Sequence, residues 1–188
     1  MKSWFAIRYR RPLVGILMIC ISNLIEAQAL QPGGVAPAQE TTVLAGAATA
    51  AGVRRCISAI DMVSRRMFTG ASRADVILDW DRSNPDGAPF FSLSGMDLHR
   101  DSALLSLTTA PVATGACAIL VERISSAPTT CGTVARTELA GYRATALVRA
   151  VTVYTNPARP RETITLVDAP PSCLVLRRQV EFNWPSGR

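Results

Sequence analysis

The stretch DWDRSNPDG, residues 79–87, holds the residue types from which a calcium site could be built. Its aspartates at the first and third positions and its serine at the fifth match the oxygen ligands that open an EF-hand loop. The glycine expected at the sixth position and the bidentate glutamate expected at the twelfth are both replaced. A looser site made of Asp79, Asp81 and Asp86 is the remaining metal candidate, with the millimolar affinity typical of extracellular modules.

The same stretch also fits a strand followed by a turn. Val76, Leu78 and Trp80 alternate with polar residues, as in a strand that has one apolar and one polar face. Asn84–Gly87 then places proline at the second and glycine at the fourth position of a tight turn. Because a strand and a turn account for most of the residues in this stretch, we expect no bound metal and no cofactor.

His99 is the only histidine, and it lies between Asp97 and Asp101. A histidine beside carboxylates can act as a general base near neutral pH, with a nearby serine as the nucleophile. The chain has no Gly-x-Ser-x-Gly elbow, however, and loop histidines are commonly solvated. We therefore expect no catalytic residue, and a secreted hydrolase built on these three residues is the alternative.

The N-terminal residues have the three parts of a secretory signal peptide. A basic start, MKSWFAIRYRRP, precedes the apolar run LVGILMICISNLI and the small-residue triplet that ends at Ala29. The run is short of the roughly 20 apolar residues that a membrane span needs. We predict a signal peptide over residues 1–29 with cleavage after Ala29, export to the periplasm or the outside, and no membrane span after cleavage.

Three variants of this export prediction stay open. Cys20 could mark a lipid attachment site, Arg10–Arg11 could mark the twin-arginine route, and the segment could remain as an uncleaved anchor. The residue before Cys20 is isoleucine rather than a small residue, and the residues around the paired arginines match poorly. The ordinary cleaved signal therefore remains the prediction.

Four cysteines follow the predicted signal peptide, and an even number in an exported chain predicts two disulfides. Without a C-x-x-C pair, and with one histidine, the chain is a poor zinc binder. If the apolar runs at 117–124 and 173–184 are parallel, Cys117 and Cys173 share one end of the sheet, and Cys131 lies about 25 Å away. We predict the pairs Cys56–Cys131 and Cys117–Cys173 over the two other connectivities.

The rest of the chain predicts a single α+β domain over residues 45–188, after a flexible leader at 30–44. Apolar residues at helical spacing predict an amphipathic helix from about Ala45 to a stop at Gly70. A second short helix is expected at 130–139, capped by Thr129 or Thr130. Short apolar or alternating runs predict the strands, at 74–80, 89–93, 103–110, 117–124, 146–154, 162–167 and 173–184. We expect an antiparallel sheet of about five to seven strands with both helices on one face.

The last of these runs alternates most clearly. Its apolar side carries Leu174, Leu176, Val180, Phe182 and Trp184, interrupted by Arg178. Its polar side carries Arg177, Gln179, Glu181 and Asn183. We expect the apolar side to be buried beneath the helices and the polar side to face water, with Arg178 paired to an acid such as Glu138 or pointing into an interface.

The residue composition of the chain also narrows the range of possible functions. Every basic residue after Lys2 is an arginine, and the arginines are interleaved with acids instead of clustering, which disfavours nucleic-acid binding. The leading prediction is a non-enzymatic binding module whose partner is an unknown protein or extracellular ligand, with contacts on the polar sheet face and the turns at 82–90 and 155–162. The alternatives are the His99 hydrolase and a calcium-stabilised extracellular domain. The sequence does not indicate the oligomeric state.

Overall fold

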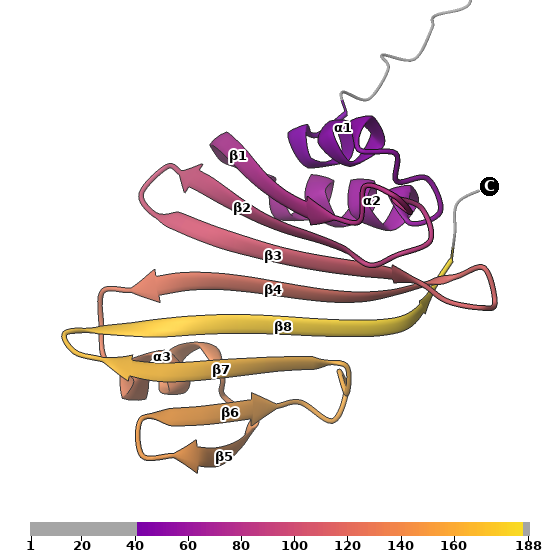
Figure 1. Ribbon diagram of the computed structural model, residues 1–188. Helices are drawn as coiled ribbons and strands as arrows, with labels where there is room; N and C mark the ends of the chain where they lie inside the picture. Colours follow the sequence, from indigo (N-terminus) through magenta and orange to yellow (C-terminus); the bar gives the residue numbers. More distant parts are fainter. Residues whose placement is uncertain (1–40, 186–188) are drawn as a thin grey trace, which may run out of the picture. The chain divides into compact units, whose positions relative to one another are not determined.

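The computed structural model describes residues 41–185, which form three helices and one sheet (Figure 1). The predicted signal peptide, its cleavage site after Ala29 and residues 30–40 of the predicted leader lie outside the described residues. Within those residues no helix is long and apolar enough to cross a membrane. The elements in chain order are α1 Val43–Ala50, α2 Ile57–Met67, β1 Ala71–Trp80, β2 Phe90–Leu98, β3 Ser102–Pro111, β4 Cys117–Ala127, α3 Cys131–Glu138, β5 Arg143–Val148, β6 Val151–Thr155, β7 Glu162–Ala169 and β8 Ser172–Trp184.

The predicted N-terminal helix is two helices rather than one. The Thr42 side chain caps α1 by accepting a hydrogen bond from the Ala45 amide, and the chain then turns at Gly52, whose φ of 97° favours glycine. The helix α2 ends at Met67, and Gly70 adopts φ 80° on the way into β1, as the predicted stop requires. The third helix is confirmed, with Thr130 as its cap.

The eight strands form one antiparallel sheet in the order β1-β2-β3-β4-β8-β7-β6-β5. The strands β1 to β4 and β5 to β7 are two meanders, and β8 returns between them to pair with β4 on one side and β7 on the other. The expected antiparallel α+β fold is correct, but the strand number exceeds the expected five to seven. The reason is the run 146–154, predicted as one strand, which folds back at Arg149–Ala150 to give β5 and β6 without any glycine or proline.

All three helices lie on one face of the sheet, as expected; in Figure 1, α2 and α3 lie behind the strands and α1 lies above the edge strand β1. The helices α1 and α2 cover β1 to β4, where Leu44 and Ile60 pack with Phe90 and Leu105 in a first hydrophobic cluster. The helix α3 covers β7 and β8, where Val134 packs in a second cluster. We call this side the helix face and the other side the open face.

The four cysteines form two disulfides, but the predicted pairing is wrong. The bonds join Cys56 to Cys117 and Cys131 to Cys173. The error came from assuming that the two cysteine-bearing strands are parallel. Because β4 and β8 are antiparallel, Cys173 lies opposite Ala127, four residues before Cys131, and at the far end of β4 from Cys117.

Non-reducing peptide mapping should therefore join the peptide that contains Cys131 to the one that contains Cys173. Replacing both of these cysteines by serine should lower the free energy of unfolding by about 4 kcal/mol, because the bond closes a loop of 42 residues. Urea denaturation of the oxidised wild type and the double variant measures this difference. A peptide linking Cys56 to Cys131 would contradict the structure.

Candidate functional site

The three carboxylates of the metal candidate lie in different surroundings. The Asp81 carboxylate accepts hydrogen bonds from the Ser83 hydroxyl at 2.6 Å and from the Ser83 amide at 2.8 Å. These bonds favour its charged form, so they hold the pKa of Asp81 below its usual value. The Asp79 side chain lies on the open face of β1, opposite Phe91 of β2.

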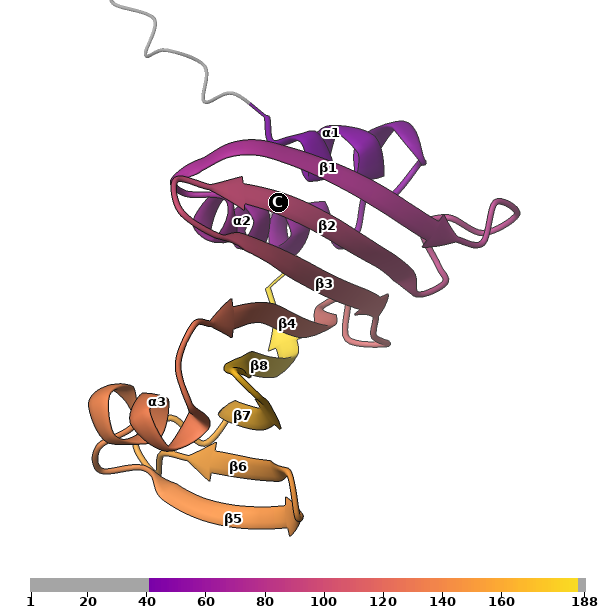
Figure 2. The same ribbon diagram turned by 90° about the vertical axis from the view of Figure 1, so that its left-hand side faces the viewer.

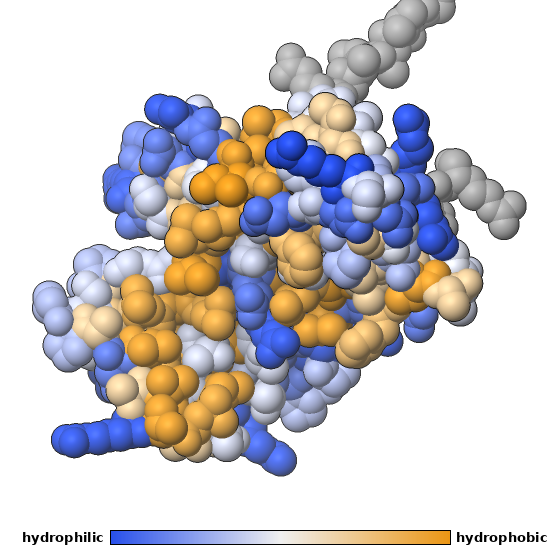
Figure 3. Space-filling view, in the orientation of Figure 1, coloured by the Kyte–Doolittle hydropathy of each residue, from blue (hydrophilic) through white to orange (hydrophobic). Residues whose placement is uncertain are grey.

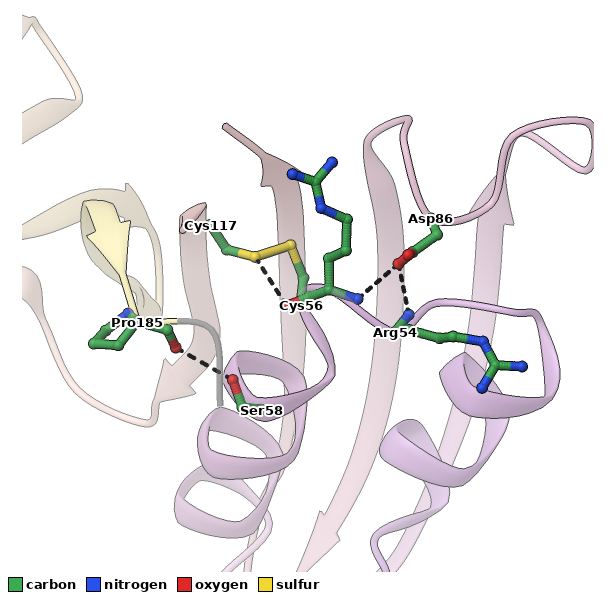
Figure 4. The surroundings of a disulfide bond; sticks show 7 residues. Arg54, Cys56, Ser58, Asp86, Cys117 and Pro185 are labelled. Atoms are coloured by element: carbon green, nitrogen blue, oxygen red, sulfur yellow. Dashed lines mark hydrogen bonds between the residues drawn. A yellow bond between two sulfur atoms is a disulfide. The ribbon is translucent and has the colours of Figure 1, made fainter. Parts of the chain in front are cut away.

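Asp86 fastens the loop between β1 and β2 to the linker between α1 and α2 (Figure 4). One oxygen of its carboxylate accepts hydrogen bonds from the Arg54 amide at 2.8 Å and the Arg55 amide at 2.6 Å. The linker continues directly into Cys56 and its bond to Cys117 at the start of β4. The Cys117 sulfur also lies 3.5 Å from the Arg55 carbonyl oxygen, which is a packing contact since a disulfide sulfur carries no hydrogen to donate.

The proposed calcium ligands are therefore not brought together. Within residues 41–185 no group of three or more histidine, cysteine, aspartate or glutamate side chains is placed to hold a metal. The DWDRSNPDG stretch is instead the end of a strand and a loop that is held in place by Asp86. Its conformation also depends on close packing, since a Cβ on Gly52 would lie 3.1 Å from the Pro85 ring.

His99 is exposed in the turn between β2 and β3. The Asp97 carboxylate accepts a hydrogen bond from the Ser102 hydroxyl at 3.3 Å, and Asp101 is bound into the turn through its backbone carbonyl. A pocket beside this turn is lined by Asp97 and Ser102 but not by His99. The three candidates thus lie near one another without the serine–histidine contact that a hydrolase needs, so the geometry gives the hydrolase hypothesis no support.

The open face of the sheet carries most of the apolar side of β8, which the sequence predicts to lie on the helix face. Leu174, Leu176, Arg178 and Val180 of β8 lie on this face, whereas Cys173 and Val175 are buried on the helix face. The prediction that the alternating apolar side of β8 lies under the helices is wrong for Leu174, Leu176 and Val180. A bulge near the end of β8 places Trp184 on the helix face, where it packs against the first hydrophobic cluster. Arg178 is bonded to Glu122 at 3.6 Å, and it is the neighbouring Arg177 that pairs with Glu138.

Strand pairing arranges the open-face side chains in rows across the sheet. One row crosses β3, β4 and β8 through Leu104, Ile124 and Leu176. A second row joins Ile77 of β1 to Leu93 of β2. We call the whole set the apolar surface; its members are Ile77, Phe91, Leu93, Leu104, Leu120, Ile124, Leu174, Leu176 and Val180.

None of the described helices covers the apolar surface, which includes a hollow; Leu120, Ile124, Leu176 and Val180 are half-buried among their neighbours, and the other members are exposed. Ile77 is 65% exposed, Leu104 is 43% exposed and Leu93 is 41% exposed. Figure 3 shows apolar side chains following one another down the side that Figure 1 turns toward the viewer. A groove of about 370 Å³ opens at Gly95, whose missing side chain leaves space between Leu104, Ile124 and Leu174.

Comparison of the chain with protein-family models, with curated proteins and with solved structures finds no match.

Removing the Asp86 carboxylate tests whether this loop is structural. Asp86→Ala should lower the free energy of unfolding by about 1–3 kcal/mol, because two backbone amides lose a charged acceptor. Asp79→Ala is the matched control, and it should change stability by less than about 0.5 kcal/mol. Both are measured by urea denaturation.

Millimolar calcium should leave the wild-type melting temperature unchanged, and a rise that Asp81→Asn abolishes would restore the metal hypothesis.

Proposed function

We propose that this protein is an exported, non-enzymatic binding domain whose apolar surface receives an apolar segment of another protein. The observation that carries the proposal is that Leu174, Leu176 and Val180 of β8 and the apolar residues beside them on β1 to β4 face none of the described helices. Fully burying an exposed side chain of this kind is worth about 1.5–3 kcal/mol, and each of these partly exposed side chains contributes a part of that against the entropic cost of association. Contiguous apolar patches on soluble domains commonly mark interaction sites.

The scaffold supports a preformed surface. The apolar side chains stand on five strands whose backbones are paired to one another. The bond from Cys56 to Cys117 fixes α2 beneath these strands, and Cys131–Cys173 fixes α3. A surface that is rigid before binding loses little conformational entropy when its partner arrives.

A protein segment fits this surface better than a small molecule. The groove is open and shallow, and apolar side chains continue beyond it across five strands, an extent that a segment of chain can cover. Asp79 and Asp97 stand on the same face at β1 and β2, so a segment with basic residues beside its apolar ones is complementary. The ion pair between Glu122 and Arg178 adds polar groups in the middle of the face.

Export is part of the proposal. The basic, apolar and small-residue sequence before residue 30 supports it. The two disulfides fit an oxidising compartment, because they form and persist mainly outside the cytosol.

Site-specific photo-crosslinking tests the binding surface. A photoreactive residue in place of Leu93 should give a discrete adduct with another protein of the native extracytoplasmic fraction. The same residue in place of Met62, which is 58% exposed on α2, should give none. Adding Leu104→Asp should reduce the Leu93 adduct about tenfold, because it places a charge in the contact. Equal adducts at both positions, an adduct only with a second copy of the chain, or crosslinking only to lipid would each overturn the proposal.

A further inference from the structure

The helix face holds a polar region at its centre, between the parts that the helices cover. In Figure 2, α1 and α2 lie beside β1 to β3, whereas α3 lies farther along the strand order near β7. Between them the helix-face positions of β4 and β8 change from apolar to charged. Val121 is followed there by Arg123, and Val175 is followed by Arg177 and Gln179.

These side chains line a cavity beside the C-terminal end of α2. Its volume is about 210 Å³, and Arg66, Arg123, Arg177, Glu162 and Gln179 supply its polar lining. A second cavity, of about 450 Å³, shares Arg66, Glu162 and Gln179 with the first and adds arginines at 159 and 161. The two cavities therefore form one trough, which we call the arginine trough.

Ion pairs account for most of the positive charge in the trough. Arg177 bonds to Glu138 at 2.8 Å, and Arg159 bonds to Glu162 at 3.4 Å. Arg161 bonds to Glu181. Among the described residues no carboxylate pairs with Arg66 or Arg123. The five arginines of the trough thus carry two more positive charges than their three carboxylate partners neutralise.

The position of Arg123 makes this excess unfavourable in the free protein. It lies directly opposite Arg177 in the antiparallel pairing of β4 with β8. Like charges in directly opposed positions of a sheet destabilise it, and only Arg177 has an acid to offset the repulsion. An anion bound between Arg66 and Arg123 would neutralise both guanidinium groups.

We propose that the arginine trough is a binding site for a phosphate-class dianion. Two guanidinium groups offer paired donors that match phosphate oxygens, and their two charges match those of a phosphate monoester near neutral pH. The Gln179 amide supplies a neutral donor in the same lining. The Glu162 carboxylate also lines the trough and would repel an anion, but its bond to Arg159 offsets its charge. This site lies on the opposite side of the sheet from the apolar surface and does not depend on its function.

Calorimetric titration of the purified exported protein with inorganic phosphate tests the site at constant ionic strength. We expect saturable binding that Arg123→Gln and Arg66→Gln each weaken about tenfold or more, because each removes a charge-assisted donor pair. Arg136→Gln is the matched control, since Arg136 lies on α3 outside the trough, and it should change the affinity less than twofold. A phosphate monoester is titrated in parallel. If it binds more tightly than inorganic phosphate, the site takes a phosphorylated molecule; if it binds less tightly, the site takes free phosphate.

The melting temperature of the phosphate-free variants gives an independent readout. Arg123→Gln should melt at the same temperature as the wild type or higher, because it removes the repulsion from Arg177. A purely structural arginine would lower the melting temperature when replaced. The proposal is overturned if phosphate binding does not saturate, if the control weakens it equally, if a dicarboxylate such as malonate binds in place of phosphate, or if Arg123→Gln melts below the wild type.

Discussion

The antiparallel pairing of β4 with β8 is the interaction on which the rest of the structure depends. It runs from Cys117 opposite Trp184 to Ala127 opposite Cys173, and it joins the four-strand meander that carries α1 and α2 to the three-strand meander near α3. Its direction decides which cysteines meet, because it brings Cys173 to the same end of the sheet as Cys131. Without it, each meander would expose a long edge and keep only its own hydrophobic cluster.

Local patterns could predict the elements, because the signals for them lie within a few residues. Thr130 before an apolar period and Gly70 after one mark a helix start and a helix end, and both occur where expected. The hairpin at Arg149–Ala150 was missed because its turn carries none of the usual turn residues. The break between α1 and α2 at Gly52 was missed because cysteine and valine kept an apparent helical period across it.

The site could not be predicted to the same extent, because its residues meet only through long-range pairing. The role of Asp86 depends on amides more than 30 residues earlier in the chain, and nothing near it in sequence indicates that contact. The pairing of the cysteines depended on strand direction, which alternation along one strand does not reveal. Alternation separated the two sides of β8 correctly as far as Glu181, but it missed the bulge that turns Trp184 to the helix face, and it does not say which side the helices cover.

At the centre of the sheet, the charged and apolar faces of β4 and β8 are the reverse of what is expected. This reversal connects both proposals. In a sheet with helices on one face, apolar residues should point toward the helices and charged residues toward water. At the middle of β4 and β8, Arg123 and Arg177 point to the helix face, whereas Ile124 and Leu176 point to the open face. The two hydrophobic clusters and the disulfides stabilise the domain, so the exposed apolar groups and the opposed arginines are local costs that a bound partner could reduce. An apolar partner on one face and an anion on the other would reduce both.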